Sequence, residues 1–192
     1  SASTVTADNV AEYMDNALGG STKQIVTIGP AGASTGARAF LFSGDATKWD
    51  VAAPFDSVVT IAADIQASSG YKGGRWLRGP AASTSTGSGG GVTATGSTAA
   101  GGTTGGAVAH LHVTAERNVT SATFRVQHST SGSTWLNLIA FTAATGVTFQ
   151  RSTVAGVVKE RVRATLSALT EGATGGSITW AVAFGRYGSP KT

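Results

Sequence analysis

The sequence contains no cysteine and few charged residues, and both absences restrict what the protein can be. Without cysteine, the chain forms no disulfide, carries no thiol nucleophile and offers no thiolate to a metal. Asp, Glu, Lys and Arg make up 12% of its 192 residues, about half the usual share. Because a soluble monomer normally has a more charged surface, we expect partner proteins to cover much of this one.

Long apolar runs and targeting signals are also missing. No segment approaches the roughly 18 consecutive apolar residues that cross a membrane, and residues 1–9 lack the basic and apolar regions of a signal peptide. No Gly-Lys-Ser/Thr follows the glycines, as a phosphate-binding loop requires. We therefore expect synthesis in the cytoplasm, no membrane partner and no cofactor.

Charge is divided unevenly along the chain. Residues 1–80 carry six basic and seven acidic side chains, a net charge of −1, whereas residues 81–192 carry eight basic and three acidic ones, a net charge of +5. Such asymmetry is found in nucleic-acid-binding proteins, but the basic half lacks their dense Arg and Lys clusters with interleaved aromatic residues. Head-to-tail contact between identical subunits also explains it, and we favour this self-contact.

One segment has low complexity. Every residue from Ala81 to Ala107 is Gly, Ala, Ser or Thr, except Val92. Such a composition buries too little apolar surface to offset its own ordering entropy. We therefore predict that one domain spanning residues 1–192 carries this segment as an inserted extended loop or arm, which lies against adjacent subunits. Ala81, Val92 and Ala107 become candidate interface residues.

The hydrophobic pattern predicts one helix followed by β-structure. Apolar residues recur at helical spacing over residues 10–18, just before Gly19 and Gly20. Short apolar or alternating segments bounded by Gly, Pro and Asp then predict strands. These segments are 23–28, 38–43, 57–66, 74–78, 108–115, 122–128, 134–141, 147–154, 157–166 and 177–186. The fold class that follows is all-β, mainly an antiparallel β-sandwich or barrel, with one N-terminal α-helix.

Alternation within the last two segments predicts which side chains share a face. In 177–186, the apolar side chains on one face are those of Ile178, Trp180, Val182 and Phe184. In 157–166, Lys159, Arg161 and Arg163 point away from the apolar face. We expect these three cations to contact another subunit.

Three groups of residues have side chains that could carry chemistry. Residues 32–36 read GASTG and match the G-x-S-x-G motif of hydrolases, but the surrounding pattern is strand and loop, so we interpret them as a turn. His110 and His112 share a strand face without an apparent third metal ligand, which favours polar residues on a half-buried strand. Trp49, which lies near several Asp residues, and Trp76 are weak candidates for stacking on a sugar. No catalytic group emerges, and we expect no enzyme activity.

From Thr123 the sequence runs TFRVQHSTSGSTWLNLIAFTAATGVTFQRSTVAGVVKERVRATLS, followed later by SITWAVAFGRY. This part, about the last third of the chain, resembles the C-terminal β-sandwich segment of structural virion proteins of tailed bacteriophages, particularly the major tail (tail tube) proteins of long-tailed phages. The residues that carry the resemblance are His128, Ser129, Gly132, Ser133, Trp135, Leu138, Phe141, Gln150, Arg151, Gly156, Val162, Arg163, Ala164, Ala183 and Phe184.

The resemblance implies a virion subunit that forms hexameric rings, which stack as a tube around double-stranded DNA. It also implies other virion proteins as partners and a long loop that reaches neighbouring subunits. The lumen of such a tube is expected to be electronegative or neutral, and the net basic charge of this chain departs from that pattern. Two alternatives stay open: a capsid decoration protein on the phage head, and a carbohydrate- or receptor-binding β-sandwich module.

Overall fold

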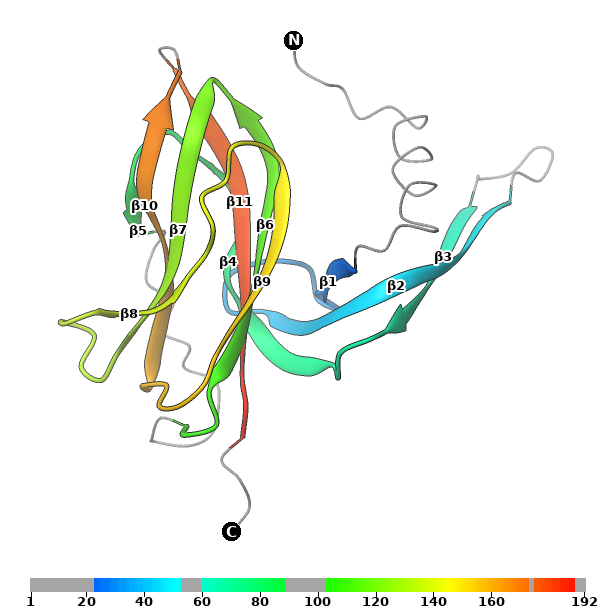
Figure 1. Cartoon of the computed structure of the whole chain (residues 1–192), viewed down its shortest axis with the longest axis horizontal. Coiled ribbons are helices and arrows are strands. Elements are labelled where there is room, and N and C mark those ends of the chain that lie inside the picture. The colour runs from blue at the N-terminus through cyan, green and yellow to red at the C-terminus, as the bar shows by residue number, and fades with distance from the viewer. Residues whose placement is uncertain (1–22, 53–59, 89–102, 173–174, 189–192) are drawn as a thin grey trace. The chain divides into compact units, whose positions relative to one another are not determined.

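The computed structural model describes residues 23–52, 60–88, 103–172 and 175–188 (Figure 1). These residues form β-strands, which confirms the all-β prediction. The strands are β1 (Gln24–Ile28), β2 (Arg38–Ala52), β3 (Thr60–Ala67), β4 (Lys72–Ser83), β5 (Gly87–Ser88), β6 (Ala107–Arg117), β7 (Val119–Ser129), β8 (Leu136–Ala140), β9 (Thr148–Val154), β10 (Arg161–Glu171) and β11 (Ser177–Arg186). The helix predicted over residues 10–18 lies outside the described residues.

The strands pair in two sheets. The first has the order β1-β2-β4-β11-β6-β9, with β3 also paired to β2, and the second has the order β5-β10-β7-β8. By their contacts, the residues of the predicted single domain divide into two compact units. The smaller unit comprises residues 1–26 and 42–71, and the larger comprises residues 27–41 and 72–192.

The smaller unit contains an antiparallel hairpin of β2 and β3. Its register runs from Gly44 opposite Ala67 to Ala52 opposite Thr60, with a bulge after Ala46. At the base of the hairpin, the amides of Ser68 and Ser69 donate to the carbonyl oxygen of Ser43 at 2.8 and 3.1 Å. Strand β2 therefore continues well past residue 43, where the sequence pattern had predicted its end.

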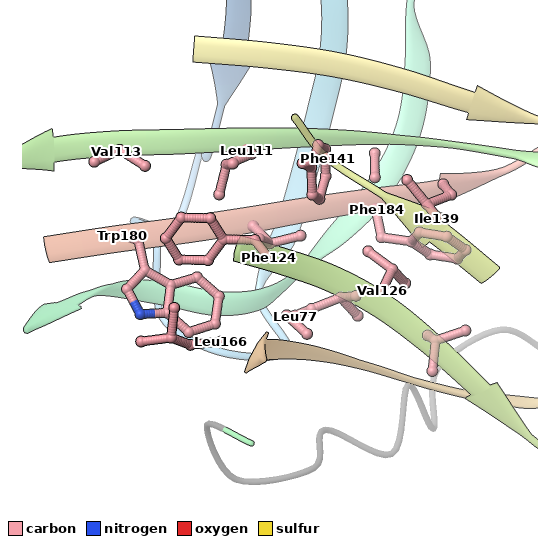
Figure 2. Close-up of a cluster of buried hydrophobic side chains, with 14 of the residues drawn as sticks. Leu77, Leu111, Val113, Phe124, Val126, Ile139, Phe141, Leu166, Trp180 and Phe184 are labelled. Carbon is pink, nitrogen blue, oxygen red and sulfur yellow. The ribbon is translucent and has the colours of Figure 1, made fainter. Parts of the chain in front are cut away.

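The larger unit is a β-sandwich with its core between the two sheets. The core side chains come from alternate positions of both sheets, as Figure 2 shows, and the rings of Phe124 and Trp180 lie 5.0 Å apart between their centroids. The predicted inward face of β11 is confirmed, because Ile178, Trp180, Val182 and Phe184 are all buried. Each large apolar side chain buried in this way contributes about 1.5–3 kcal/mol to folding.

The ends of the predicted loop belong to this sandwich, so its boundaries at residues 81 and 107 are wrong. Ala81 lies in β4, opposite Trp180 of β11. Strand β5 pairs with β10, and Thr103 bridges Val158 before the chain enters β6. Ala107 is the first residue of β6 and is 0% exposed, which makes it a core residue rather than a surface one. The middle of the predicted loop, with Val92, lies outside the described residues.

A single residue carries the chain from the first sheet to the second. Asn118 separates β6 from β7 and has a φ of 52°, in the left-handed region. Asn tolerates this region better than most side chains. Its carbonyl oxygen accepts a hydrogen bond from the amide of Gly172 at 3.0 Å, which anchors this corner beside the end of β10.

Candidate interaction surface

The outer face of the second sheet carries a row of cations. Along β10, Val162, Ala164 and Leu166 are buried in the core, so the alternating residues Arg161 and Arg163 lie on the opposite face. Strand β7 runs beside β10 (Figure 1) and places Gln127 opposite Arg163. We call Arg125, Gln127, Trp135, Arg161 and Arg163 the basic face.

Arg163 lies over an aromatic ring. Its Nε donates a hydrogen bond to Oε1 of Gln127 at 2.9 Å, and its guanidinium carbon lies 4.3 Å from the ring centroid of Trp135. Gln127 is itself fixed, because its Nε2 donates to Oδ1 of Asn137 at 3.1 Å. The indole Nε1 of Trp135 donates to the carbonyl oxygen of Gly132 at 2.8 Å. The guanidinium therefore has a preset orientation before any partner binds.

Arg161 lies against the turn between β7 and β8. A Cβ placed on Gly132 would be 3.2 Å from Nη1 of Arg161, and the φ of Gly132 is +87°, so glycine suits both the turn and the approaching guanidinium. The Nε of Arg161 is buried and has no hydrogen-bond partner among the described residues. A buried donor without a partner costs about 1–3 kcal/mol.

Arg125 adds a third cation beside a buried hydroxyl. It lies opposite Thr165 in the register of β7 and β10. Thr165 is buried, and its Oγ1 also lacks a hydrogen-bond partner within the described part of the chain. No described acidic side chain forms an ion pair with Arg125, Arg161 or Arg163. The basic face therefore offers donors and positive charge without an acidic counterpart of its own.

Partial burial has an electrostatic consequence at Arg163. Desolvation lowers the pKa of its guanidinium below the ordinary value for arginine. An arginine stays protonated at neutral pH all the same. Arg163 is thus a cation that has lost part of its hydration, and a carboxylate or another anion would stabilise it.

Lys159 belongs to the preceding loop and not to the strand. The prediction that a strand begins at residue 157 is wrong, because β10 begins at Arg161. The amide of Lys159 donates to Nδ1 of His128 at 3.2 Å, and its carbonyl oxygen accepts from Nη2 of Arg186 at 2.7 Å. Arg186 also donates to the carbonyl oxygen of Glu160. These contacts fix the loop backbone, and Lys159 lies outside the row made by the arginines.

The outer face of the first sheet is built differently. Trp76 packs there with Val108, Ala181 and Ala183, in a second apolar cluster that also contains Ala39, Leu41 and the partly buried Ala33 and Ala37. Trp76 is only 5% exposed, so the prediction that it stacks on a sugar is wrong. A Cβ on Gly29 would lie 2.8 Å from the Trp76 Nε1, so residues 27–41 can lie close over the ring.

The two histidines of β6, His110 and His112, contact Thr27, the first residue of the segment 27–41. Oγ1 of Thr27 is 3.0 Å from Nδ1 of His110 and 2.8 Å from Nε2 of His112. Because one hydroxyl has one proton, it donates to one imidazole and accepts from the other. His110 is completely buried, and burial lowers the pKa of His112 to about 4. Both histidines alternate out of the sandwich core, as predicted, but the face that they occupy is covered by Thr27 instead of being open to solvent.

The remaining candidates contribute little to a site. Trp49 lies in β2 opposite Ala63, and its side chain is outside what the structure describes. The GASTG segment lies between β1 and β2, where Gly32 and Gly36 have positive φ values, in agreement with a turn. Within the described ranges, no three His, Asp or Glu side chains gather as a metal site. No helix among those residues is long and apolar enough to span a membrane.

The alternation in the sequence predicted that Arg161 and Arg163 lie on an outer face. It did not predict that Gln127 and Trp135 orient Arg163. Arg125 and Gln127 follow the same alternation in the predicted strand 122–128 and could have been assigned to the outer face. The contact between Trp135 and Arg163 depends on the pairing of β7 with β8 and β10, which the sequence does not specify. Comparisons with protein-family models, with curated proteins and with solved structures found no match, so the residues described above are the basis for inferring function.

Proposed function

We propose that this chain is a non-enzymatic structural subunit of a bacteriophage virion, a major tail tube protein that acts by assembling with copies of itself. The observation that carries the proposal is the basic face, where three arginines have no acidic partner among the described residues. The resemblance to tail tube proteins adds support, because it begins within β7 and extends to the end of β11. The low share of charged residues also fits a surface that is largely covered by partners.

The proposed mechanism is geometric, and strand edges contribute to it. In the larger unit, β9 ends the order of the first sheet, while β5 and β8 are the outer strands of the second. Exposed edges present unpaired backbone groups that promote pairing with another chain. Rings in which neighbouring subunits complete these sheets satisfy those groups and block uncontrolled aggregation.

In such a tube, the basic face would lie at a contact between subunits and away from the lumen. Positive charge along the lumen would bind the phosphates of passing DNA and slow its movement. Placing the arginines against an acidic neighbour removes that attraction. This arrangement also explains how a chain with a net charge of +4 serves as a DNA conduit.

Electron microscopy of the purified protein tests the proposal, combined with sedimentation velocity over a range of concentrations. We expect rings or tubes that become more abundant as the concentration rises, with a subunit contact well above about 1,000 Å². Monodisperse monomers at every concentration would contradict it. Binding to isolated phage heads, without self-assembly, would instead favour a decoration protein.

One observation favours a second candidate, a carbohydrate-binding module. Trp135 is partly exposed and lies close to the guanidinium of Arg163, which is hydrogen-bonded to the amide of Gln127. An aromatic ring beside polar groups is typical of ligand sites. If Trp135 serves in this way, replacing it with Ala would abolish binding on a glycan array and leave the oligomeric state unchanged.

A further inference from the structure

The two compact units have opposite net charges. Counted over the sequence, residues 1–26 and 42–71 of the smaller unit include seven acidic and two basic side chains, a net charge of −5. Residues 27–41 and 72–192 of the larger unit include twelve basic and three acidic side chains, a net charge of +9. The difference in net charge between the two units is larger than the difference between residues 1–80 and residues 81–192. The acidic and basic side chains are therefore divided between the structural units.

The hairpin of the smaller unit has an acidic face. Asp45 of β2 and Asp64 of β3 are both exposed. Asp45 lies opposite Gln66, which is two residues from Asp64, so all three side chains share one face of the hairpin, together with Lys48, which lies opposite Asp64 beyond the bulge. We call Asp45, Asp64 and Gln66 the acidic face. Neither carboxylate forms an ion pair with a side chain that the structure describes, and the side chain of Lys48 is outside that description.

The spacing of charges on the acidic face matches that of the basic face. Diagonal neighbours on paired antiparallel strands are about 7–8 Å apart, which sets the separation of Asp45 and Asp64. Residues two apart on one strand, such as Arg161 and Arg163, are separated by about 7 Å. Two carboxylates can therefore meet two guanidinium groups at the same time.

We propose that the acidic face of one copy docks on the basic face of a second copy. The inference rests on the proposed function and specifies the surfaces that join the subunits. Each carboxylate would accept charge-assisted hydrogen bonds from the guanidinium group of an arginine. Because the two faces are different, the contact is heterologous and propagates from one copy to the next.

Several observations favour a second copy over a nucleic acid. The complementary carboxylates belong to the same polypeptide, so every basic face has one acidic face available at equal concentration. Gln127 holds Arg163 over the ring of Trp135, and a guanidinium fixed in this way suits a carboxylate at a fixed position. Nucleic-acid surfaces instead use many basic side chains along an extended backbone.

Charge exchange between the faces tests the inference. One variant, Arg161→Glu with Arg163→Glu, makes the basic face acidic, and a second, Asp45→Lys with Asp64→Lys, makes the acidic face basic. We expect each variant alone to require at least about tenfold more protein than the wild type to assemble, measured by sedimentation velocity at low salt. An equimolar mixture should assemble again, because each variant then supplies the partner that the other needs. A chain with all four substitutions should also assemble.

Matched controls separate these contacts from the effect of net charge. Arg117→Glu with Arg151→Glu, and Glu116→Lys with Glu171→Lys, change the charge by the same amounts at exposed positions outside both faces. These controls should assemble at a concentration close to that of the wild type. Thermal unfolding of every variant verifies that it is folded. If the charge reversal at Arg161 prevents folding, the single variant Arg163→Gln replaces the double variant in the assembly test.

The possible outcomes distinguish failure of the inference from failure of the proposed function. If the wild type assembles but the mixture and the fourfold variant do not, the docking surfaces are wrong and the proposal of self-assembly stands. A wild type that remains monomeric overturns both. If the Arg161 and Arg163 variant assembles normally but no longer binds double-stranded DNA, the basic face binds nucleic acid and the inference is overturned.

Discussion

The outer faces of the two sheets in the larger unit differ in whether residues of the same chain cover them. On the first sheet, the apolar cluster around Trp76 is packed against residues 27–41 of the same chain. On the second sheet, Arg161 and Arg163 have no acidic counterpart among the described residues. A face that is already buried by its own chain contributes to stability. A face with charges and donors left over is suited to binding another molecule.

The largest expected effect on stability is at the covered face. Trp76→Ala should lower the free energy of unfolding by about 3–5 kcal/mol, because it leaves a large cavity beneath residues 27–41. Trp135→Ala, the matched change on the basic face, should cost about 1 kcal/mol, the value of its contact with Arg163. Urea unfolding of both variants measures the difference. Similar losses would mean that the two faces do not differ in this way.

The pH dependence of stability tests the burial of His112. Its pKa of about 4 in the folded chain lies below the ordinary value of 6.5, so the unfolded chain binds a proton first as the pH falls. The stability is complete above pH 6.5 and decreases between pH 6.5 and 4, by roughly 3 kcal/mol if the whole shift is realised. The neighbouring groups are His110 on the same strand and Arg151, which lies opposite His110 on β9.

His112→Phe provides the comparison, since it cannot titrate and still fills the space beside Phe149. The free energy of unfolding of this variant should depend less on pH over the same range. His128, whose pKa is also lowered by desolvation, contributes equally to both proteins. Parallel pH profiles for the wild type and the variant would show that His112 is exposed to solvent.

The hydroxyl of Thr27 has a smaller expected effect. Thr27→Val keeps the shape of the side chain but removes a hydrogen-bond partner of both His110 and His112. We expect a loss of about 1–3 kcal/mol in the free energy of unfolding. Thr27→Ser retains the hydroxyl and should lose clearly less. Equal losses in the two variants would assign the effect to the methyl group.

The smallest effect on stability is expected at the basic face itself. Arg163→Gln should change the free energy of unfolding by no more than about 1 kcal/mol, since a partly buried charge without an ion-pair partner contributes little to folding. Its assembly should nevertheless weaken, because one of the paired cations is lost. A nearly unchanged free energy of unfolding, together with a smaller fraction of oligomers in sedimentation velocity, would show that Arg163 contributes to assembly, whereas Trp76 contributes to stability. A large loss of stability would assign Arg163 to the fold.

Local patterns in the sequence predicted much of the sandwich. Alternation identified the inward face of β11 and the outward position of Arg161 and Arg163, since a sheet buries every second residue. It misplaced Lys159, because Gly156, with a φ of +91°, lies in a loop that separates β9 from β10. The positions of such strand ends depend on backbone turns, which the alternation of apolar and polar residues does not predict.

Long-range packing accounts for what the sequence did not predict. The burial of Trp76 requires residues 27–41 to lie over a strand far along the chain, and no local pattern encodes that. The contact between Trp135 and Arg163 likewise depends on strand order. The position of Asn118 at the corner between the two sheets likewise follows from its backbone conformation.

Hydroxyl-radical footprinting of the dilute and the concentrated protein tests the central claim most directly. Trp135 on the basic face should react in the monomer and become at least about fivefold less reactive when the chain assembles, the loss expected when a partner covers a partly exposed ring. Trp76 should react slowly in both states, because its own chain already covers it. Equal reactivity of Trp135 before and after assembly would contradict the claim that the second sheet's outer face is completed by another copy.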